Sequence, residues 1–382
     1  MPRTIALLAA LLLLAALLHR INRSLPSPSR KSSPLAVPRF LHPDTWERKK
    51  IEETSRENRL AVESVLEATE ESTQGLKTLT QSETFPRLDG KIVWQVAEPL
   101  PAPISPAAAF YRNGQVFVAD PQGTICSARI SSDGALCPWG VQMGRLPKGS
   151  SACGIAALDH LLVSHSKDRL HVAGIDEDGV GEWHEVGRVP GISGRPALAG
   201  KGDRLYLAGG AGERGNLPLV RSIDFDGKGR ALRIEAQSPL PKGISDGSLA
   251  VGENRIYWVG GREDSTWTGV VFSARVAANG DLGEWVEEPA LPVGLRKPTL
   301  QIWDDTLWVV GGGHLRNRVF AAPLTASGRL REWIEIESDL PEPLEDGACL
   351  RAGGRFLLLG GRRSNGAYYP NRAVYWWMPA GD

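Results

Sequence analysis

Short apolar stretches alternate with turn-forming residues in a pattern that repeats six times after Leu100. Each repeat opens with Leu-Pro or Val-Pro, and the six prolines lie 43 to 51 residues apart. An apolar segment follows in every repeat, and the six segments read VFVAD, LLVSH, LYLAGG, IYWVGG, LWVVGG and FLLLGG. Runs of this length between turn residues predict β-strands, and a period near 50 residues predicts one propeller blade per repeat.

The second half of each repeat carries a third apolar stretch and then, in most copies, a tryptophan. The residues at this place are Trp139, Trp183, Ile234, Trp285 and Trp333. A tryptophan buries about 150 to 250 Å², so we expect these side chains to pack one blade against the next. Ile234 should fill its place less well.

The strand count predicts how the ring closes. The last repeat has only three strands and ends near 374–378, whereas 91–97, with Trp94, is an unmatched strand before the first repeat. Pairing the two removes both open edges. We therefore expect an all-β, six-bladed propeller over residues 90–382, with the N-terminal strand completing the last blade.

The first residues have the pattern of an export signal. An apolar run from Ile5 to Leu18 follows Arg3, which favours a signal peptide or a membrane anchor over residues 1–23. The run is shorter than the roughly 20 residues of a membrane span, yet no small-residue cleavage site follows it, so both alternatives remain open. We expect an exported protein of the periplasm or cell envelope, cleaved or anchored.

Two further segments separate this run from the repeats. Residues 24–43 are rich in Pro and Ser, which predicts an extended linker. Residues 44–85 are charged and have a half-filled heptad-like stripe. They are expected to form a helix that packs on the propeller or a self-associating stalk.

Composition narrows the partners. The chain has 44 basic and 44 acidic residues. This balance argues against binding to nucleic acid and against binding to a membrane surface through a polybasic patch. Membrane contact is expected only through the N-terminal segment. The 43 glycines and 12 tryptophans agree with many turns and aromatic anchors.

The period, the strand ending in Gly-Gly and the later tryptophan resemble the Kelch family of β-propellers, in the galactose oxidase/Kelch superfamily. The resemblance covers about Lys91 to Asp382, with Gly-Gly in four copies; the Tyr usual between Gly-Gly and Trp is irregular. Six blades after an export signal are also similar, in size and architecture, to bacterial sialic-acid mutarotases. That similarity implies an enzyme acting on an anionic sugar as one alternative.

Candidate site residues lie where each innermost strand should enter the channel mouth. Counting fifteen residues back from the second Gly position gives Ser105, Ser150, Arg195, Asp246, Lys297 and Asp346. The loops after Gly-Gly add Arg262, Arg316 and Arg362. Cations alternating with acids form either a self-neutralising network or a site for a polar or anionic ligand, carbohydrate among them. Asp246 and Asp346 are the catalytic candidates of the enzyme alternative.

No metal or cofactor motif accompanies these residues, because the seven histidines do not cluster at ligand spacing. Cys126 and Cys137 flank one hairpin turn, and a local disulfide there is an open alternative. The sequence favours a binding platform for a small ligand or a protein rather than an enzyme; a structural role in the cell envelope is the third alternative.

Overall fold

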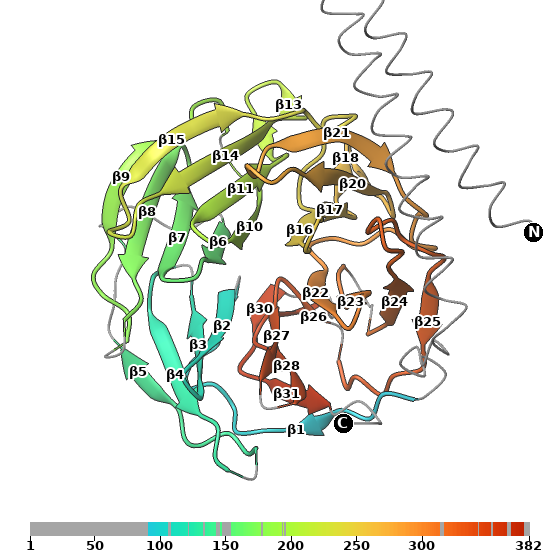
Figure 1. The fold of residues 1–382 in the computed structure, drawn as a ribbon. Coiled ribbons are helices and arrows are strands. Elements are labelled where there is room, and N and C mark those ends of the chain that lie inside the picture. The colour runs from blue at the N-terminus through green and yellow to red at the C-terminus, as the bar shows by residue number, and fades with distance from the viewer. Residues whose placement is uncertain are drawn as a thin grey trace, which may run out of the picture. The chain divides into compact units, whose positions relative to one another are not determined.

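Six four-stranded antiparallel sheets surround a central opening (Figure 1). A computed structural model describes residues 91–377 except 106–107, 121, 133, 143–145, 147–153, 177–178, 193, 195, 314–316, 343, 353 and 365–367. These residues belong to one compact unit, Thr84–Asp382, and their regular structure is all β. The prediction of a six-bladed propeller is confirmed.

The four strands of each blade run in order from the channel to the perimeter. Blades 1 to 3 consist of β2 (Ala108–Arg112), β3 (Gln115–Ala119), β4 (Ile125–Arg129) and β5 (Gly140–Gln142); β6 (Gly154–Ala157), β7 (Leu161–Ser166), β8 (Arg169–Gly174) and β9 (His184–Arg188); and β10 (Ala197–Lys201), β11 (Arg204–Ala208), β14 (Val220–Phe225) and β15 (Ala231–Ala236). Blades 4 to 6 consist of β16 (Ser248–Val251), β17 (Arg255–Val259), β20 (Val271–Val276) and β21 (Leu282–Glu287); β22 (Thr299–Trp303), β23 (Thr306–Val310), β24 (Val319–Pro323) and β25 (Ile334–Ile336); and β27 (Ala348–Ala352), β28 (Arg355–Leu359), β31 (Val374–Trp377) and β1 (Gln95–Val96).

Small additional sheets accompany three blades, each containing a hairpin that connects the second strand to the third. They are the hairpin β12 (Ala211–Gly212) with β13 (Gly215–Asn216), the hairpin β18 (Arg262–Glu263) with β19 (Thr266–Trp267), and the sheet of β26 (Leu344–Glu345), β29 (Arg362–Ser364) and β30 (Tyr368–Pro370). The hairpin of each sheet follows a Gly-Gly pair, whereas β26 precedes the inner strand of its blade.

The ring closes as predicted. In β1, Gln95 lies opposite Trp376 of β31, and Val96 lies opposite Tyr375. The paired strand is shorter than the expected 91–97, because the start of that segment bonds to blade 5 instead. Ile92 forms a bridge with Ser338, so the segment ties two blades together.

The repeated tryptophans pack between blades as expected. Each described one donates its indole N–H to the preceding blade: Trp94 to Ser338 Oγ (2.8 Å), Trp139 to Glu98 O (3.0 Å), Trp183 to Gly123 O (3.1 Å), Trp285 to Ser238 O (2.9 Å) and Trp333 to Pro289 O (2.7 Å). Ile234, which has no such donor, is 40% exposed and lies beside Gly187 of blade 2. The expectation of a poorer fit at this interface is confirmed.

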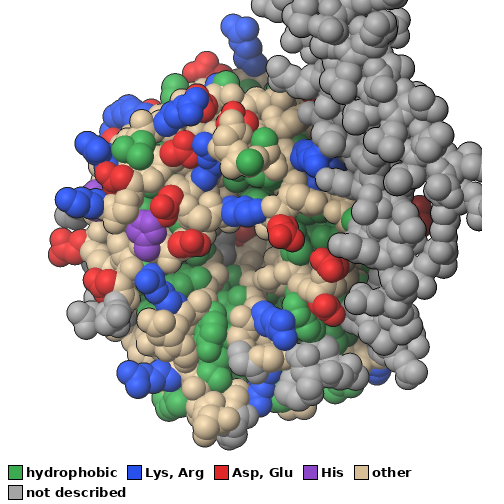
Figure 2. All heavy atoms as spheres, in the orientation of Figure 1, with side chains coloured by type: hydrophobic (Ala, Val, Ile, Leu, Met, Phe, Trp, Pro, Cys, Tyr) green, Lys and Arg blue, Asp and Glu red, His purple; other side chains and the backbone are tan. Residues whose placement is uncertain are grey.

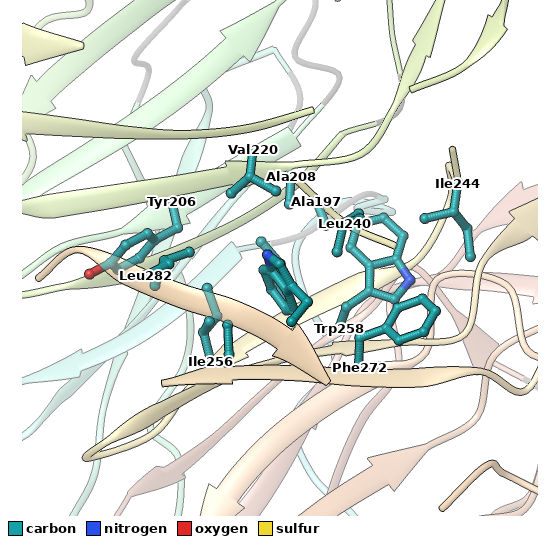
Figure 3. Packing of buried hydrophobic residues seen from close by; sticks show 13 residues of the cluster. Ala197, Tyr206, Ala208, Val220, Leu240, Ile244, Ile256, Trp258, Phe272 and Leu282 are labelled. Carbon is teal, nitrogen blue, oxygen red and sulfur yellow. The ribbon is translucent and has the colours of Figure 1, made fainter. Parts of the chain in front are cut away.

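The hydrophobic core is divided among the blade interfaces. Between blades 3 and 4, Tyr206 and Val220 pack with Trp258 and Phe272 (Figure 3). The Tyr206 hydroxyl donates to the carbonyl of Gly280 in the next blade at 2.7 Å. Apolar contact and a satisfied polar end therefore act together at the same interface.

The segments predicted at 1–23, 24–43 and 44–85 lie outside the described residues. Within 91–377, apart from its gaps, no helix has the length and apolar character needed to cross a membrane.

Candidate functional site

Three of the residues predicted at the channel mouth share an uncommon backbone conformation. Asp246, Lys297 and Asp346 have φ values of 56°, 42° and 60°, and each stands two residues before its inner strand. The left-handed region disfavours side chains other than Gly, Asn and Asp, and such residues cluster at ligand-binding sites. The shared geometry supports a common role for these positions.

Backbone hydrogen bonds hold these residues in place from blade to blade. The Lys297 N–H donates to Asp246 O at 2.8 Å, and the Asp346 N–H donates to Lys297 O at 3.1 Å. The second glycine of each Gly-Gly pair also donates to the next blade: Gly210 to Ile244 O (2.9 Å), Gly261 to Leu295 O, Gly312 to Leu344 O and Gly361 to Ile104 O (each 2.8 Å).

The Gly-Gly pairs are required by this arrangement. Gly261 has φ +110°, and a Cβ there would lie 2.7 Å from the carbonyl oxygen of Ser245. A side chain would therefore push away the loop that leads into the inner strand of the same blade. Through these close contacts the repeat motif fixes the backbone of the mouth.

The mouth side chains form a charged group across blades 5, 6 and 1. Lys297 Nζ lies 3.1 Å from both carboxylate oxygens of Asp346. Arg362 Nη2 lies 3.7 Å from Asp346 Oδ2, and its Nε donates to Ser105 Oγ at 2.9 Å. Two cations thus share one carboxylate, and the side chains of Lys297, Asp346 and Arg362 are 17%, 11% and 30% exposed.

Arg262 belongs to a second group beside the mouth. Its guanidinium lies 5.8 Å from the ring centroid of Trp267, and the guanidinium of Arg296 lies 5.4 Å from the same ring. Arg296 also pairs with buried Glu345 at 3.1 Å. Sequence reasoning missed Arg296 and Glu345, although each directly precedes a predicted mouth position.

The other predicted positions are placed differently. Asp246 is 1% exposed and does not line the central cavity. Ser105 stands three residues before β2, not two, and Ser150 stands four before β6, because blades 1 and 2 lack the Gly-Gly pair that anchors the alignment. Ser150, Arg195 and Arg316 lie outside the described residues.

The central cavity begins at this group. It has a volume of about 350 Å³ and is lined mainly by small residues of the inner strands, with Lys297 and Asp346 among them. Figure 2 shows a hollow at the centre of the ring, with hydrophobic side chains inside it and side chains of both charges around it. A cavity of this size suits a small molecule.

The described residues provide neither a cluster of metal ligands nor a disulfide at the expected hairpin. Among the described residues, no group of three or more His, Cys, Asp or Glu is placed to hold a metal ion. Cys126 and Cys137 are both free thiols, which resolves the open alternative of a local bridge.

Comparison with known proteins supports the fold. No protein-family model matches the chain. Kelch-like protein terF of Aspergillus terreus is 25% identical over 189 residues, 44% of this chain; the chain therefore spans only 38% of that relative. The structure of YjhT aligns with a TM-score of 0.57 at 13% identity over 74% of this chain and 97% of that one. The second similarity is one of fold.

Proposed function

Because the fold is that of a six-bladed Kelch-type β-propeller, we propose that the protein is a binding platform whose channel mouth holds a small anionic ligand. The observation that carries the proposal is the convergence of Lys297 and Arg362 on Asp346 above the cavity. One carboxylate cannot neutralise two cations. A ligand carboxylate would complete the set with charge-assisted hydrogen bonds.

The rest of the cavity favours a ligand with many hydroxyl groups. Its wall consists of the innermost strands, which are sheet edges and therefore turn unpaired backbone groups towards the channel. Backbone N–H and C=O groups bind hydroxyls without adding charge. A carboxylated sugar combines the two features, so we place carbohydrate acids first among the ligands.

Titration calorimetry with glucuronate and N-acetylneuraminate tests this proposal, with glucose as the uncharged match. Either acid should bind, and Arg362→Ala should weaken binding by about tenfold to a hundredfold, since a charge-assisted hydrogen bond contributes about 1.5 to 3 kcal/mol. Lys228→Ala, an exposed lysine in the outer turn of blade 3, serves as the control. Equal binding of acid and neutral sugars, or no effect of Arg362→Ala, contradicts the proposal.

The enzyme alternative has one specific observation in its favour. Asp346 is a carboxylate that lines the cavity between two cations, where it could exchange a proton with a bound sugar. Asp346→Asn should then abolish catalysed anomer exchange, followed by magnetisation-transfer NMR, while binding remains. If the anomers exchange no faster with wild-type protein than in buffer alone, this activity is excluded for the sugars tested.

Export is proposed on the N-terminal pattern alone, as is a role in the periplasm or cell envelope. Cell fractionation with an antibody against the propeller tests it. Recovery of the protein in the cytoplasmic fraction would overturn the proposal, and the apparent mass would distinguish a cleaved from an anchored chain.

A further inference from the structure

A second cavity lies away from the channel mouth, between blades 2 and 3. It has a volume of about 630 Å³ and is bordered by the turn Lys167–Asp168 on one side and by residues of hairpin β12–β13 on the other. Blade 2 joins β7 to β8 through those two turn residues and has no projecting hairpin. We call this cavity the blade 2/3 groove.

The border of the groove carries charges without partners. Lys167, Glu213 and Arg214 form no hydrogen bond or ion pair with other described residues. Asp168, in contrast, accepts a hydrogen bond from Arg188 Nη1 at 3.2 Å. Since that pair is neutral, two free cations face one free acid, and the groove has an excess of positive charge.

The floor of the groove is apolar and kept open by glycines. Ile192, which is 2% exposed, and Leu217 supply the apolar surface. Gly191 has φ +91°, and a Cβ on Gly212 would lie 3.2 Å from the carbonyl oxygen of Gly191. Larger residues at these two positions would narrow the floor.

Blade 2 also contains a buried imidazole, which does not line the groove. His165 stands two residues before Lys167 and shares the face of β7 that carries Val163, which packs towards blade 3. His165 is fully buried and neither of its ring nitrogens has a partner. A buried polar group of this kind calls for a partner that the described residues do not supply.

We propose that the blade 2/3 groove binds a small amphipathic carboxylate, with the carboxylate between Lys167 and Arg214 and the apolar body on Ile192 and Leu217. The groove is separate from the channel mouth, and the inference does not depend on the ligand proposed there. Its size falls within the range of small-molecule sites.

Three matched probes test the two halves of this recognition with the full-length chain. Hexanoate carries both features, hexanamide lacks the charge, and acetate lacks the apolar body. In saturation-transfer NMR titrations hexanoate should bind, and each of the other two should bind at least threefold more weakly. Binding should decrease as salt rises, because the cations are exposed.

Variants assign the binding to the groove. Lys167→Ala and Arg214→Ala should each weaken hexanoate binding roughly threefold to fivefold, as expected for exposed ion pairs. Lys228→Ala, which belongs to neither the groove nor the channel mouth, should leave it unchanged. Equal melting temperatures would show that the variants are folded.

The inference fails if wild type binds no hexanoate at a hexanoate concentration of about 20 mM. It also fails if hexanamide binds as tightly as hexanoate, or if the Lys167→Ala/Arg214→Ala double variant keeps full affinity for hexanoate. Loss of binding in Lys297→Ala alone would also overturn it, by assigning hexanoate to the mouth.

Discussion

Blades 2 and 4 end their second strands in different ways. In blade 4, β17 stops at Val259, and Gly260 and Gly261 turn the chain outward into hairpin β18–β19. In blade 2, β7 continues to Ser166 and returns through Lys167 and Asp168. In these two blades the hairpin is present only where Gly-Gly ends the second strand, and Gly261 donates to Leu295 O of the next inner loop. Blade 5 keeps Gly311-Gly312 and has no hairpin among its described residues, so the pair allows a hairpin without requiring one.

The two blades also differ inside. At the last residue paired with the inner strand, blade 4 has Val259 opposite Ser248, whereas blade 2 has His165 opposite Gly154. Ser164, Ser166 and His171 are buried in blade 2 as well. Blade 2 thus has no hairpin on this face and a more polar interior than blade 4, and substitutions in and around these blades test what each difference contributes.

The largest expected effect concerns the tryptophan between blades. Trp285→Ala should lower the free energy of unfolding by about 3 to 5 kcal/mol, because it empties a large aromatic site and removes the hydrogen bond to Ser238. Ile234→Ala, at the equivalent place of blade 3, should cost about 1 kcal/mol, since Ile234 is largely exposed. Denaturant titration measures both. Similar losses would show that the interfaces are equivalent after all.

The second effect is a pH dependence specific to blade 2. Burial lowers the pKa of His165 from 6.5 to about 4, so the unfolded chain binds the proton more tightly than the folded one. Stability should be unaffected above pH 6.5 and fall between pH 6.5 and 4, by an amount on the order of 3 kcal/mol. His165→Val, which copies blade 4, should flatten this part of the curve. An unchanged slope in the variant would assign the dependence to other groups, such as His171, whose pKa burial also lowers.

A third experiment tests the Gly-Gly pair. Gly261→Ala should destabilise by about 2 kcal/mol, since both its positive φ and the contact with Ser245 O oppose a Cβ. Gly114 also has a positive φ, +77°, but a Cβ there would meet open space. Gly114→Ala should therefore lower the free energy of unfolding by only about 1 kcal/mol. Chemical denaturation gives both values, and their difference isolates the close contact. Equal values would remove the argument that Gly-Gly is needed for packing.

The smallest effect is expected at the turn of blade 2. Lys167 has φ +55°, and glycine would relieve about 1 kcal/mol of backbone strain while adding a similar entropic cost in the unfolded chain. Lys167→Gly should therefore change the melting temperature by little. A large loss would show that the lysine side chain itself stabilises the turn.

The sequence predicted those features that depend on local pattern. The repeated Gly-Gly pairs and tryptophans such as Trp285 predicted the six blades, and the unmatched strand with Trp94 predicted how the ring closes. Each of these motifs is explained by one dominant physical requirement, a tight turn, a packed aromatic ring or a paired strand edge. The fixed spacing also predicted Lys297 and Asp346 as neighbours at the mouth.

Features that depend on packing between blades were not predictable in the same way. Ser105 was displaced by one position because blade 1 has no Gly-Gly to count from. The pair Arg296–Glu345 and the two sides of the blade 2/3 groove bring together side chains up to about 50 residues apart, from neighbouring blades. The local sequence pattern therefore predicts the blades, whereas the charge contacts between blades become visible only in the folded structure.

The closure of the ring has a consequence for biosynthesis. Gln95 and its partner Trp376 are joined only when nearly the whole propeller has left the ribosome, so blade 6 is the last to acquire its fourth strand. Until β31 is made, the edges of its two neighbours, β1 and β28, are both open. Contacts of such long sequence separation also form slowly. A chain interrupted before Val374 would present an unpaired strand to its neighbours, which makes truncated products prone to join one another by strand exchange.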